Sequence, residues 1–546
     1  MTSERVPVVV IGAGPTGVAV ASMLAQRGVR SVLLERYDDI FPLPRAVHAD
    51  DEVVRILQQL GVDKDFGSIS RPAQGMRLVD GHRRVLAEFR RDGHSGEHGH
   101  PQSNLFDQPD LERLLRRNLA ALNVDLRCGA ELVGLDQTPG FGVLVTYRDV
   151  RTGATQRLQA QVVLGCDGAN STVRTMIGSR LMNLRFEERW LVVDVDCPAQ
   201  LDVWDGVEQV CDPGRAATAM RVGPQRYRFE FRLLDGERVQ DLTDPDMLAA
   251  LLAPWTGAVP RDQVQVVRSA GYTFRARVAD RWQVGRVLLL GDAAHQTPPF
   301  IGQGMGAGLR DASNLAWKLA VVLRHGADPA LLATYELERK PAARALIRAA
   351  VLVGWAMTSG QGAVAPIHRE VLAVLGRTPG ATRALARTTT PRLGASPLLN
   401  APRRLGVTHR RDPTGRLCPQ PWVVDEHGES VRLDTLLGNG FSTISDGPVD
   451  SAFAALMTGL GPAVTVDVSG IPAAGVLAVD SPQLRDWLRA AGARSVLVRP
   501  DRVVALAWPR KAARRRGRSR EVTDFVATFG AFFDARPHDG ERPRVP

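Results

Sequence analysis

The stretch Gly12-Ala13-Gly14-Pro15-Thr16-Gly17 decides the fold, because it directly follows the apolar run VPVVVI at residues 6–11. The run is typical of a short buried strand. An apolar helix is expected after the glycines, running to about Arg27 and ended by Gly28, and RSVLLER at 30–36 predicts a second strand. A strand, helix and strand within roughly 30 residues is the building block of a parallel sheet between helices.

The same glycines indicate a phosphate site. Gly12 permits a tight turn, Gly14 lets a pyrophosphate approach the backbone, and Gly17 lets the helix pack closely on the sheet. The phosphate would then meet the N–H groups at the helix start. Glu35 follows 18 residues after Gly17, where an acid accepts hydrogen bonds from a ribose hydroxyl. We therefore favour a Rossmann-like dinucleotide site over an ordinary glycine-rich turn with a surface glutamate.

Two later segments also follow buried strands. Asp167-Gly168-Ala169-Asn170-Ser171-Thr172-Val173-Arg174 comes after QAQVVLGC (159–166), and Gly291-Asp292-Ala293-Ala294-His295 after VGRVLLL (284–290). The carboxyl ends of parallel strands are where such sheets bind ligands. The glycine-rich loop at 298–308 can offer backbone N–H groups to an electron-rich ring. Helix capping is the structural alternative for both aspartates, and for His295 we favour a structural role over that of a catalytic base.

The pattern changes between about 180 and 280, where alternating segments such as YRFEFRL (227–233) predict antiparallel strands. Helical periodicity returns at 308–325 and 329–356, and a Gly/Pro/Thr-rich linker is expected at 377–403. We therefore expect residues 1–180 and 281–400 to form an α/β domain with its following helices. Residues 181–280 would be an inserted substrate-binding sheet, and 404–546 a small C-terminal α/β domain.

These ordered motifs resemble those of the class A FAD-dependent aromatic hydroxylases, the superfamily of para-hydroxybenzoate hydroxylase, over about residues 5–345. Three further stretches are similar to the 3-(3-hydroxyphenyl)propionate/3-hydroxycinnamate hydroxylases. They are residues 44–52 (PRAVHADDE) with Arg55, residues 108–112 (QPDLE), and residues 310–319 (RDASNLAWKL).

The resemblance implies FAD, with NADH or NADPH as a transient co-substrate and O2 and a small aromatic molecule as the other reactants. It implies hydroxylation of a phenol through a flavin C4a-hydroperoxide, with 3-(3-hydroxyphenyl)propionate-like substrates favoured. An aromatic polyketide or antibiotic hydroxylase, or a non-hydroxylating flavin oxidoreductase, is the alternative. The cofactor-binding residues expected on this basis are Gly12, Gly14, Pro15, Thr16, Gly17, Glu35, Arg36, Arg45, Gln108, Asp167, Gly168, Gly291, Asp292, Pro298, Gly302, Gly304 and Met305.

No catalytic residue is identified by the motifs. A hydrogen-bonding partner for the phenol oxygen is required if the ring is to react near its deprotonated form. Tyr227, Tyr272 and His48 are the candidates. A substrate carboxylate would need an arginine, and the expected lid offers Arg189, Arg221, Arg226 and Arg228.

The C-terminal domain resembles the thioredoxin-like domain of larger family members, but Cys418 is followed by Pro419, Gln420 and Pro421 in place of a redox CxxC. We expect it to be structural or to form a dimer interface, so that a homodimer is one option. The five cysteines lie too far apart for a metal cluster or a disulfide framework, which suits the reducing cytoplasm.

The net charge of +10 brings a nucleic-acid partner into consideration. The densest basic run, from Arg510 to Arg520, contains no aromatic residue for base stacking, so we expect a solvated loop and no nucleic-acid partner. Glycines and a proline interrupt the N-terminal apolar stretch, and no run of about 20 apolar residues predicts a membrane span.

Overall fold

The computed structural model describes residues 4–41, 46–91, 95–138, 140, 142–212, 214–257, 259–358, 390–400, 412–425, 427–451, 453–454, 463–470, 475–510 and 525–533. Arg45, most of the expected linker at 377–403, and the basic run beyond Arg510 lie outside the described residues. None of the helices in these described ranges is long and apolar enough to cross a membrane. The same ranges contain no group of three or more His, Cys, Asp or Glu side chains arranged to hold a metal.

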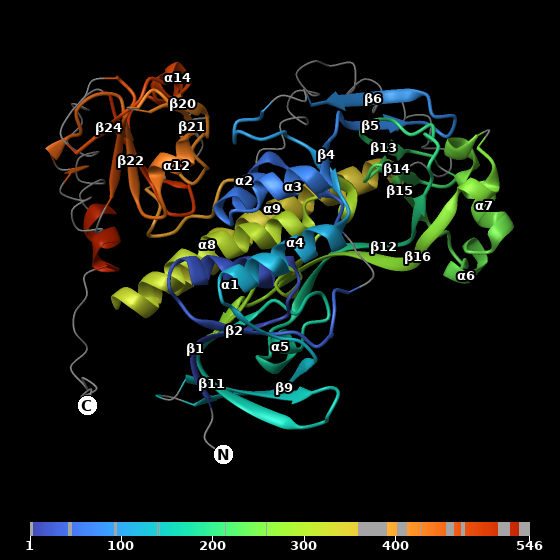
Figure 1. Cartoon of the computed structure of the whole chain (residues 1–546), viewed down its shortest axis with the longest axis horizontal. Helices are drawn as coiled ribbons and strands as arrows, with labels where there is room; N and C mark the ends of the chain where they lie inside the picture. Colours follow the sequence, from blue (N-terminus) through green and yellow to red (C-terminus); the bar gives the residue numbers. More distant parts are fainter. Residues whose placement is uncertain are drawn as a thin grey trace.

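The first sheet is built around the apolar N-terminal strand (Figure 1). Its order is β17-β18-β11-β1-β2-β8, and β1, β2, β8, β11 and β18 pair in parallel. The hairpin strands β9 and β10 extend from β11 on the antiparallel side. The bounds are β1 Glu4–Ile11, β2 Ser31–Leu34, β8 Asp125–Arg127, β9 Ala130–Thr138, β10 Gly142–Asp149, β11 Thr155–Gly165, β17 Gln283–Val284 and β18 Val287–Leu289.

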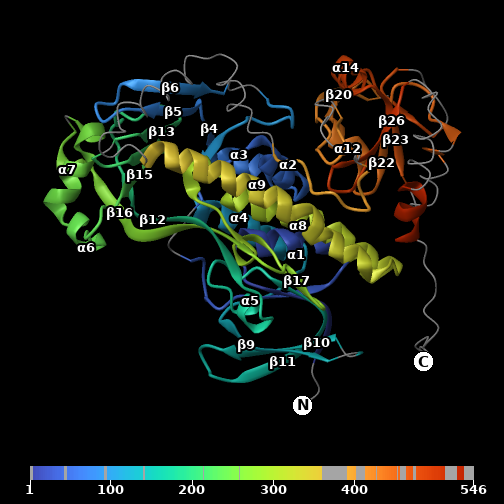
Figure 2. The same cartoon turned by 180° about the vertical axis from the view of Figure 1, so that it is seen from behind.

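Helices cover this sheet and form the largest core with it. α1 packs against α8 and α4, and its face from Gly17 to Leu24 is buried. α8 and α9 run side by side across the molecule from the first sheet toward the second (Figures 1 and 2). The helices and short 3₁₀ turns are α1 Pro15–Gln26, α2 Asp51–Gln59, α3 Asp63–Ile69, α4 Gln108–Ala121, α5 Thr172–Met176, η2 Gly291–Ala293, η3 Pro299–Ile301, α8 Gly304–His325, η4 Pro329–Leu332 and α9 Ala333–Thr358.

The second sheet has the order β19-β16-β12-β15-β14-β13-β5-β6. The expected insertion at 181–280 supplies its long antiparallel strands. β5 and β6 come from the segment assigned to the first domain, and β5 joins in parallel beside β13. The bounds are β5 Gly75–Val79, β6 Val85–Arg90, β12 Leu181–Asp196, β13 Val207–Val210, β14 Ala217–Arg221, β15 Arg226–Arg232, β16 Gln265–Ala279 and β19 His295–Gln296.

The two faces of the second sheet differ. One face packs under α6 Val239–Leu242 and α7 Pro245–Thr256 in a closed apolar cluster that includes Tyr227, Phe229, Phe231 and Trp255. The other face points toward the first domain. A separate small sheet has the order β3 His48–Ala49, β7 Asn104–Phe106 and β4 Ser70–Pro72, and η1 Arg261–Gln263 precedes β16.

The C-terminal domain is a separate α/β unit that packs beside α2 and α8 (Figure 2). Its five-stranded sheet has the order β24-β23-β22-β25-β26, with β22 parallel to β23 and antiparallel to β25. The bounds are β20 Trp422–Val424, β21 Ser430–Arg432, α12 Leu433–Leu437, β22 Ser442–Ser445, β23 Val464–Asp467, β24 Leu477–Ala478, α14 Pro482–Ala491, β25 Ala493–Val498 and β26 Val504–Pro509.

Buried ion pairs join this domain to the first. Arg55 of α2 donates two hydrogen bonds to the carboxylate of Asp434, at 2.8 and 2.6 Å, and a third to the carbonyl oxygen of Cys418 at 2.6 Å. Arg499 of the C-terminal domain makes a second bidentate pair with Glu338 of α9, at 2.8 and 2.9 Å. Removing one member of such a pair leaves a buried charge, so the two domains are energetically coupled.

Candidate active site

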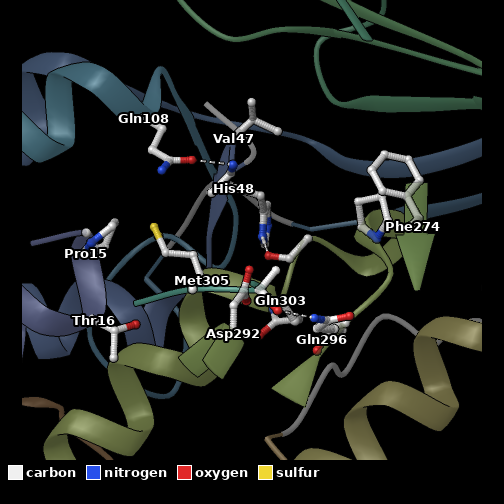
Figure 3. A pocket seen from close by; sticks show the side chains of 18 of the residues that line it. Pro15, Thr16, Val47, His48, Gln108, Phe274, Asp292, Gln296, Gln303 and Met305 are labelled. Atoms are coloured by element: carbon white, nitrogen blue, oxygen red, sulfur yellow. Dashed lines mark hydrogen bonds between the residues drawn. The ribbon is translucent and has the colours of Figure 1, made fainter. Parts of the chain in front are cut away.

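A single cavity of about 930 Å³ extends from the glycine-rich turn after β1 to the inner face of the second sheet. Figure 3 shows Pro15 and Thr16 on one side and Phe274 on the other, with Asp292 and Met305 between them. All three sequence motifs contribute to its wall. The cavity therefore connects the expected dinucleotide site with the expected substrate site.

At the first end, the glycines have different roles. A Cβ on Gly17 would overlap the carbonyl oxygen of Gly12, and a Cβ on Gly12, whose φ is +98°, would lie 2.6 Å from the carbonyl oxygen of Cys166. A Cβ on Gly14 would meet nothing within 4 Å. The space in front of Gly14 is thus open toward the cavity, at the start of a helix whose first turn carries no acidic residue. An anionic phosphate suits this position.

Glu35 shapes the same turn. Its carboxylate accepts hydrogen bonds from the backbone N–H of Ala13 at 2.7 Å and of Tyr37 at 3.0 Å, and it lines the cavity. Each carboxylate oxygen can accept more than one hydrogen bond. The residue can therefore hold the loop and still accept a bond from a ligand hydroxyl.

The segment after β11 is organised by Asp167. Its carboxylate accepts hydrogen bonds from the Ser171 hydroxyl at 2.5 Å and the Val173 N–H at 3.0 Å, while burial raises the pKa of this carboxyl above its ordinary value. Ser171 caps α5 by accepting from the Arg174 N–H at 2.9 Å. This segment therefore caps α5, as the structural alternative predicted. Asp167 and Gly168 also line the cavity.

The segment after β18 is held from behind by Asp311 of α8. This buried carboxylate accepts hydrogen bonds from the Gly291 N–H at 3.1 Å and from Arg339 at 2.8 Å, and it contacts His295 Nε2 at 2.7 Å. His295 is fully buried and does not line the cavity. Asp292 does line it. His295 thus supports the loop that presents Asp292.

Gln108 and His48 lie near the middle of the cavity. They belong to residues 108–112 and 44–52, two of the stretches that are similar to the 3-(3-hydroxyphenyl)propionate/3-hydroxycinnamate hydroxylases. Gln108 accepts a hydrogen bond from the Ala46 N–H at 2.7 Å and donates one to Glu112 at 2.7 Å. His48 Nε2 lies 3.0 Å from the Ser103 hydroxyl, and its Nδ1 lies 3.3 Å from the carbonyl oxygen of Gly302. Burial lowers the pKa of His48 to about 4, so the imidazole is neutral at pH 7.

Most of the expected cofactor residues surround the cavity. Those that line it are Gly12, Gly14, Pro15, Thr16, Glu35, Arg36, Gln108, Asp167, Gly168, Asp292, Gly302, Gly304 and Met305. Gly17, Gly291 and Pro298 do not line it. Gly17 packs on Gly12, and Gly291 has a φ of +60°. Arg45 lies outside the described residues.

The three catalytic candidates differ in whether they line the cavity. Tyr272 and His48 line the cavity. Tyr227 does not, because it projects from the opposite face of β15 into the apolar cluster under α7. Its hydroxyl accepts a long hydrogen bond, 3.4 Å, from the Leu201 N–H. Tyr227 is therefore removed from the candidates for contact with substrate.

Of the four arginines considered for a substrate carboxylate, only Arg228 lines the cavity. It already makes a bidentate pair with Asp194, at 2.8 and 2.9 Å. Arg226 pairs with Asp196 and Asp107 outside the cavity wall. Arg189 and Arg221 donate to backbone carbonyl groups.

Three polar residues of the inner sheet face were not singled out from the sequence: Gln209, Thr218 and Glu230. All three are buried. Burial raises the pKa of Glu230 to about 7, against the opposing effect of Arg228. The alternation in YRFEFRL could have pointed to Glu230, because Arg228 and Glu230 occupy the face of the strand opposite Tyr227 and Phe229.

Comparison with known proteins identifies the cofactor. Residues 5–350 match the FAD-binding domain family, and residues 415–523 match the HcaD C-terminal domain family. The chain belongs to the FAD-binding domain family. It is an FAD-dependent aromatic hydroxylase, a monooxygenase of the class that its ordered motifs resemble.

Relatives cover most of this FAD-dependent hydroxylase. A probable NADH-specific resorcinol 4-hydroxylase of Rhodococcus jostii (strain RHA1) is 35% identical over 82% of this chain and 80% of its own length. A 3-(3-hydroxy-phenyl)propionate/3-hydroxycinnamic acid hydroxylase of Comamonas testosteroni is 31% identical over 94% and 96%. Aklavinone-11 hydroxylase, solved with FAD and aklavinone, is 26% identical, covers 97% of this chain and 99% of its own, and superposes with a TM-score of 0.76.

Proposed function

We propose that the protein uses NADH or NADPH and O2 to hydroxylate a phenolic ring, with 3-(3-hydroxyphenyl)propionate-like or resorcinol-like substrates favoured. One observation carries this proposal: the cavity is continuous from the phosphate-binding turn to a partly polar sheet face. A cofactor and an aromatic substrate can therefore share one enclosed space. The named activities of the relatives supply the substrate classes.

The residues present fit FAD. Gly14 and the start of α1 would hold the pyrophosphate, Glu35 the adenosine ribose, and Asp292 the ribityl–phosphate region. The loop with Gly302, Gly304 and Met305 would face the flavin ring. When bound, FAD accepts hydride from NAD(P)H and activates O2, whereas the chain positions the reactants and excludes water.

Water exclusion rests on an aromatic wall at the sheet end of the cavity. Phe300 of η3 makes edge contacts with Trp190 at 5.6 Å and with Phe274 at 6.3 Å between ring centroids. Tyr272 stacks on Phe274 at 6.3 Å. An apolar enclosure protects a reactive oxygen species from hydrolysis and strengthens the polar contacts inside it. We propose that Tyr272 and neutral His48 orient the reactants through hydrogen bonds.

A second candidate substrate class is an aromatic polyketide. The aklavinone-bound structure shares the whole fold with this chain, C-terminal domain included. A polyketide is larger than a single-ring phenol, so the two classes differ in the volume that they need at the sheet end of the cavity.

We propose that the C-terminal domain is a thioredoxin-like unit with a structural role or a dimer interface. Its mixed sheet, with parallel β22 and β23 next to the antiparallel pair β25 and β26, supports this interpretation. Cys418 is buried beside Arg55, and all five cysteines are free thiols. We propose a cytoplasmic location, where free thiols persist.

The direct test is to purify the holoenzyme, identify its flavin, and measure NADH and NADPH oxidation with single-ring phenols and with polyketides. The expected result is substrate-accelerated oxidation together with a product that has gained one oxygen atom. NAD(P)H oxidation that no phenol or polyketide accelerates would refute the proposal. In the same assay, Asp292→Ala is expected to lose most of its flavin during gel filtration.

A further inference from the structure

The inner face of the second sheet carries a row of polar residues set by strand register. Gln209 of β13 pairs with Thr218 of β14, Thr218 pairs with Glu230 of β15, and Glu230 pairs with Val192 of β12. Side chains directly opposite each other on neighbouring strands lie about 4.5–5.5 Å apart at Cβ. All four line the cavity. Gln209, Thr218 and Glu230 therefore present one contiguous polar strip to whatever occupies it.

Gln209 is incompletely satisfied in this strip. Its Nε2 donates to the carbonyl oxygen of Phe300 at 2.9 Å, whereas its buried Oε1 has no hydrogen-bond partner among the described residues. The side chain is only 2% exposed. A buried amide oxygen without a partner is destabilising, so a ligand that donates a hydrogen bond is favoured here.

The carboxyl group of Glu230 also lacks a hydrogen-bond partner among the described residues, although the residue is only 7% exposed. The charged groups that face it are Arg228 on its own strand and Asp194 on β12. These two neutralise each other, and Arg268 of β16 also donates to Asp194 at 2.8 Å. β14 contributes Thr218 and Met220, and β13 contributes Gln209 and Val207.

We propose that the carboxyl group of Glu230 binds a ring hydroxyl of the substrate and takes its proton, and that Gln209 Oε1 accepts a hydrogen bond from a second donor on the same substrate. In this step the phenol O–H bond breaks, a carboxyl O–H bond forms, and the electron pair stays on the phenol oxygen. The electron density thereby released activates the ring toward an electrophilic oxygen. This inference rests on the proposed hydroxylation of a phenol.

The environment suits that role. A general base is most effective when its pKa lies near the working pH, and burial has moved the pKa of Glu230 to about 7. Arg228 cannot take the proton, because its guanidinium is already protonated and has no acceptor atom. Its bidentate pair with Asp194 fixes its position beside Glu230. Glu230 would recognise a phenol through its free hydroxyl group. A methyl ether of the same ring would therefore bind less well.

The test uses oxidised holoenzyme and follows the flavin absorbance on titration with resorcinol, 3-(3-hydroxyphenyl)propionate and their phenol methyl ethers. Wild type is expected to prefer the phenols by tenfold or more, and Glu230→Gln to lose this preference. Gln209→Leu is expected to weaken resorcinol binding severalfold. The pH profile of kcat/KM is expected to lose its ionisation near pH 7 in Glu230→Gln and to regain it in part in Glu230→Asp.

Glu88→Gln is the matched control, because Glu88 lies in β6 of the same sheet, pairs with Arg90, and does not line the cavity. It should behave as wild type. Equal binding of phenols and ethers by wild type, or an unchanged preference and pH profile in Glu230→Gln, would overturn the inference. Should wild type prefer phenols without oxygenating them, the proposed function fails while the binding preference still decides the role of Glu230.

Discussion

Arg174 donates a hydrogen bond to the carbonyl oxygen of Ala293 at 3.0 Å, which joins the segment after β11 to the segment after β18. Its other terminal nitrogen donates to the carbonyl oxygen of Ala169, also at 3.0 Å. One side chain thus fixes the distance between two loops that both border the cavity. The loops carry Asp167 and Asp292, which are 125 residues apart in the sequence.

Arg174→Ala should therefore weaken FAD binding. Hydrogen bonds from a charged group contribute about 1.5–3 kcal/mol each, and we expect at least about a tenfold increase in the Kd of FAD because both loops are released. Fluorescence titration of the apoprotein measures this value. Arg180→Ala, at an exposed neighbouring position, serves as the control. An unchanged Kd in Arg174→Ala would mean that the loops are positioned without this residue.

Gly14→Ala should lower the affinity for FAD, whereas Gly17→Ala should lower the stability of the apoprotein. Gly14 has a φ of −72°, which alanine adopts easily, and its Cβ would enter open space, so the apoprotein should keep its Tm. FAD affinity should fall, because the methyl group occupies the space expected for the pyrophosphate. Gly17→Ala should destabilise the apoprotein by several kcal/mol, since its Cβ would overlap the Gly12 carbonyl. Equal loss of Tm in both variants would contradict this division.

Asp434→Asn should destabilise the whole protein. It leaves Arg55 buried without its anionic partner, which typically costs about 3–5 kcal/mol. Arg55 holds the pKa of Asp434 down at about 2 against the effect of burial. The stabilisation is therefore present above the ordinary carboxyl pKa and is lost as the pH falls from about 4 to about 2.

Urea unfolding at pH 7 and at pH 3 measures this effect, and the difference between wild type and Asp434→Asn should shrink at the lower pH. Asp486→Asn, on the exposed side of α14, should change the free energy of unfolding little at either pH. A variant as stable as wild type at pH 7 would show that the interdomain pair contributes no net stability.

Glu230→Gln should stabilise the ligand-free protein at alkaline pH. The pKa of Glu230 in the folded protein, about 7, lies above its ordinary value of 4.5. Its contribution to stability is thus fully present below pH 4.5 and is lost as the pH rises through 7. Because glutamine does not ionise, the variant should exceed wild type by roughly 3 kcal/mol at pH 9 and by little at pH 4. A constant difference across this range would contradict the elevated pKa.

The first domain could be predicted from the sequence because its signals are local. Gly12 and Gly17 are adjacent to the strand and helix that need them, and Glu35 follows at a fixed spacing. The recruitment of β5 and β6 into the second sheet could not be predicted, because β5 pairs with β13 across about 130 residues of chain. Periodicity marks a strand but does not name its neighbour.

The polar strip was missed for a related reason. A single glutamine or threonine in a sequence does not indicate a binding site. Gln209 and Thr218 become part of a site only because the strand register places them beside Glu230. For Tyr227 the alternation was visible, but the sequence does not say which face of β15 a helix covers. Only the packing of α7 decides that the aromatic face is closed and that the face with Arg228 and Glu230 is open.

The alternation within β15 also bears on how such an enzyme can evolve. Tyr227, Phe229 and Phe231 belong to the closed core, whereas Arg228 and Glu230 face the cavity. A point mutation at Glu230, which has no ion-pair partner among the described residues, can therefore change substrate preference without disturbing the core next to it. A one-residue insertion would exchange the two sets and destroy both functions, so selection on this strand should accept substitutions and reject changes in length.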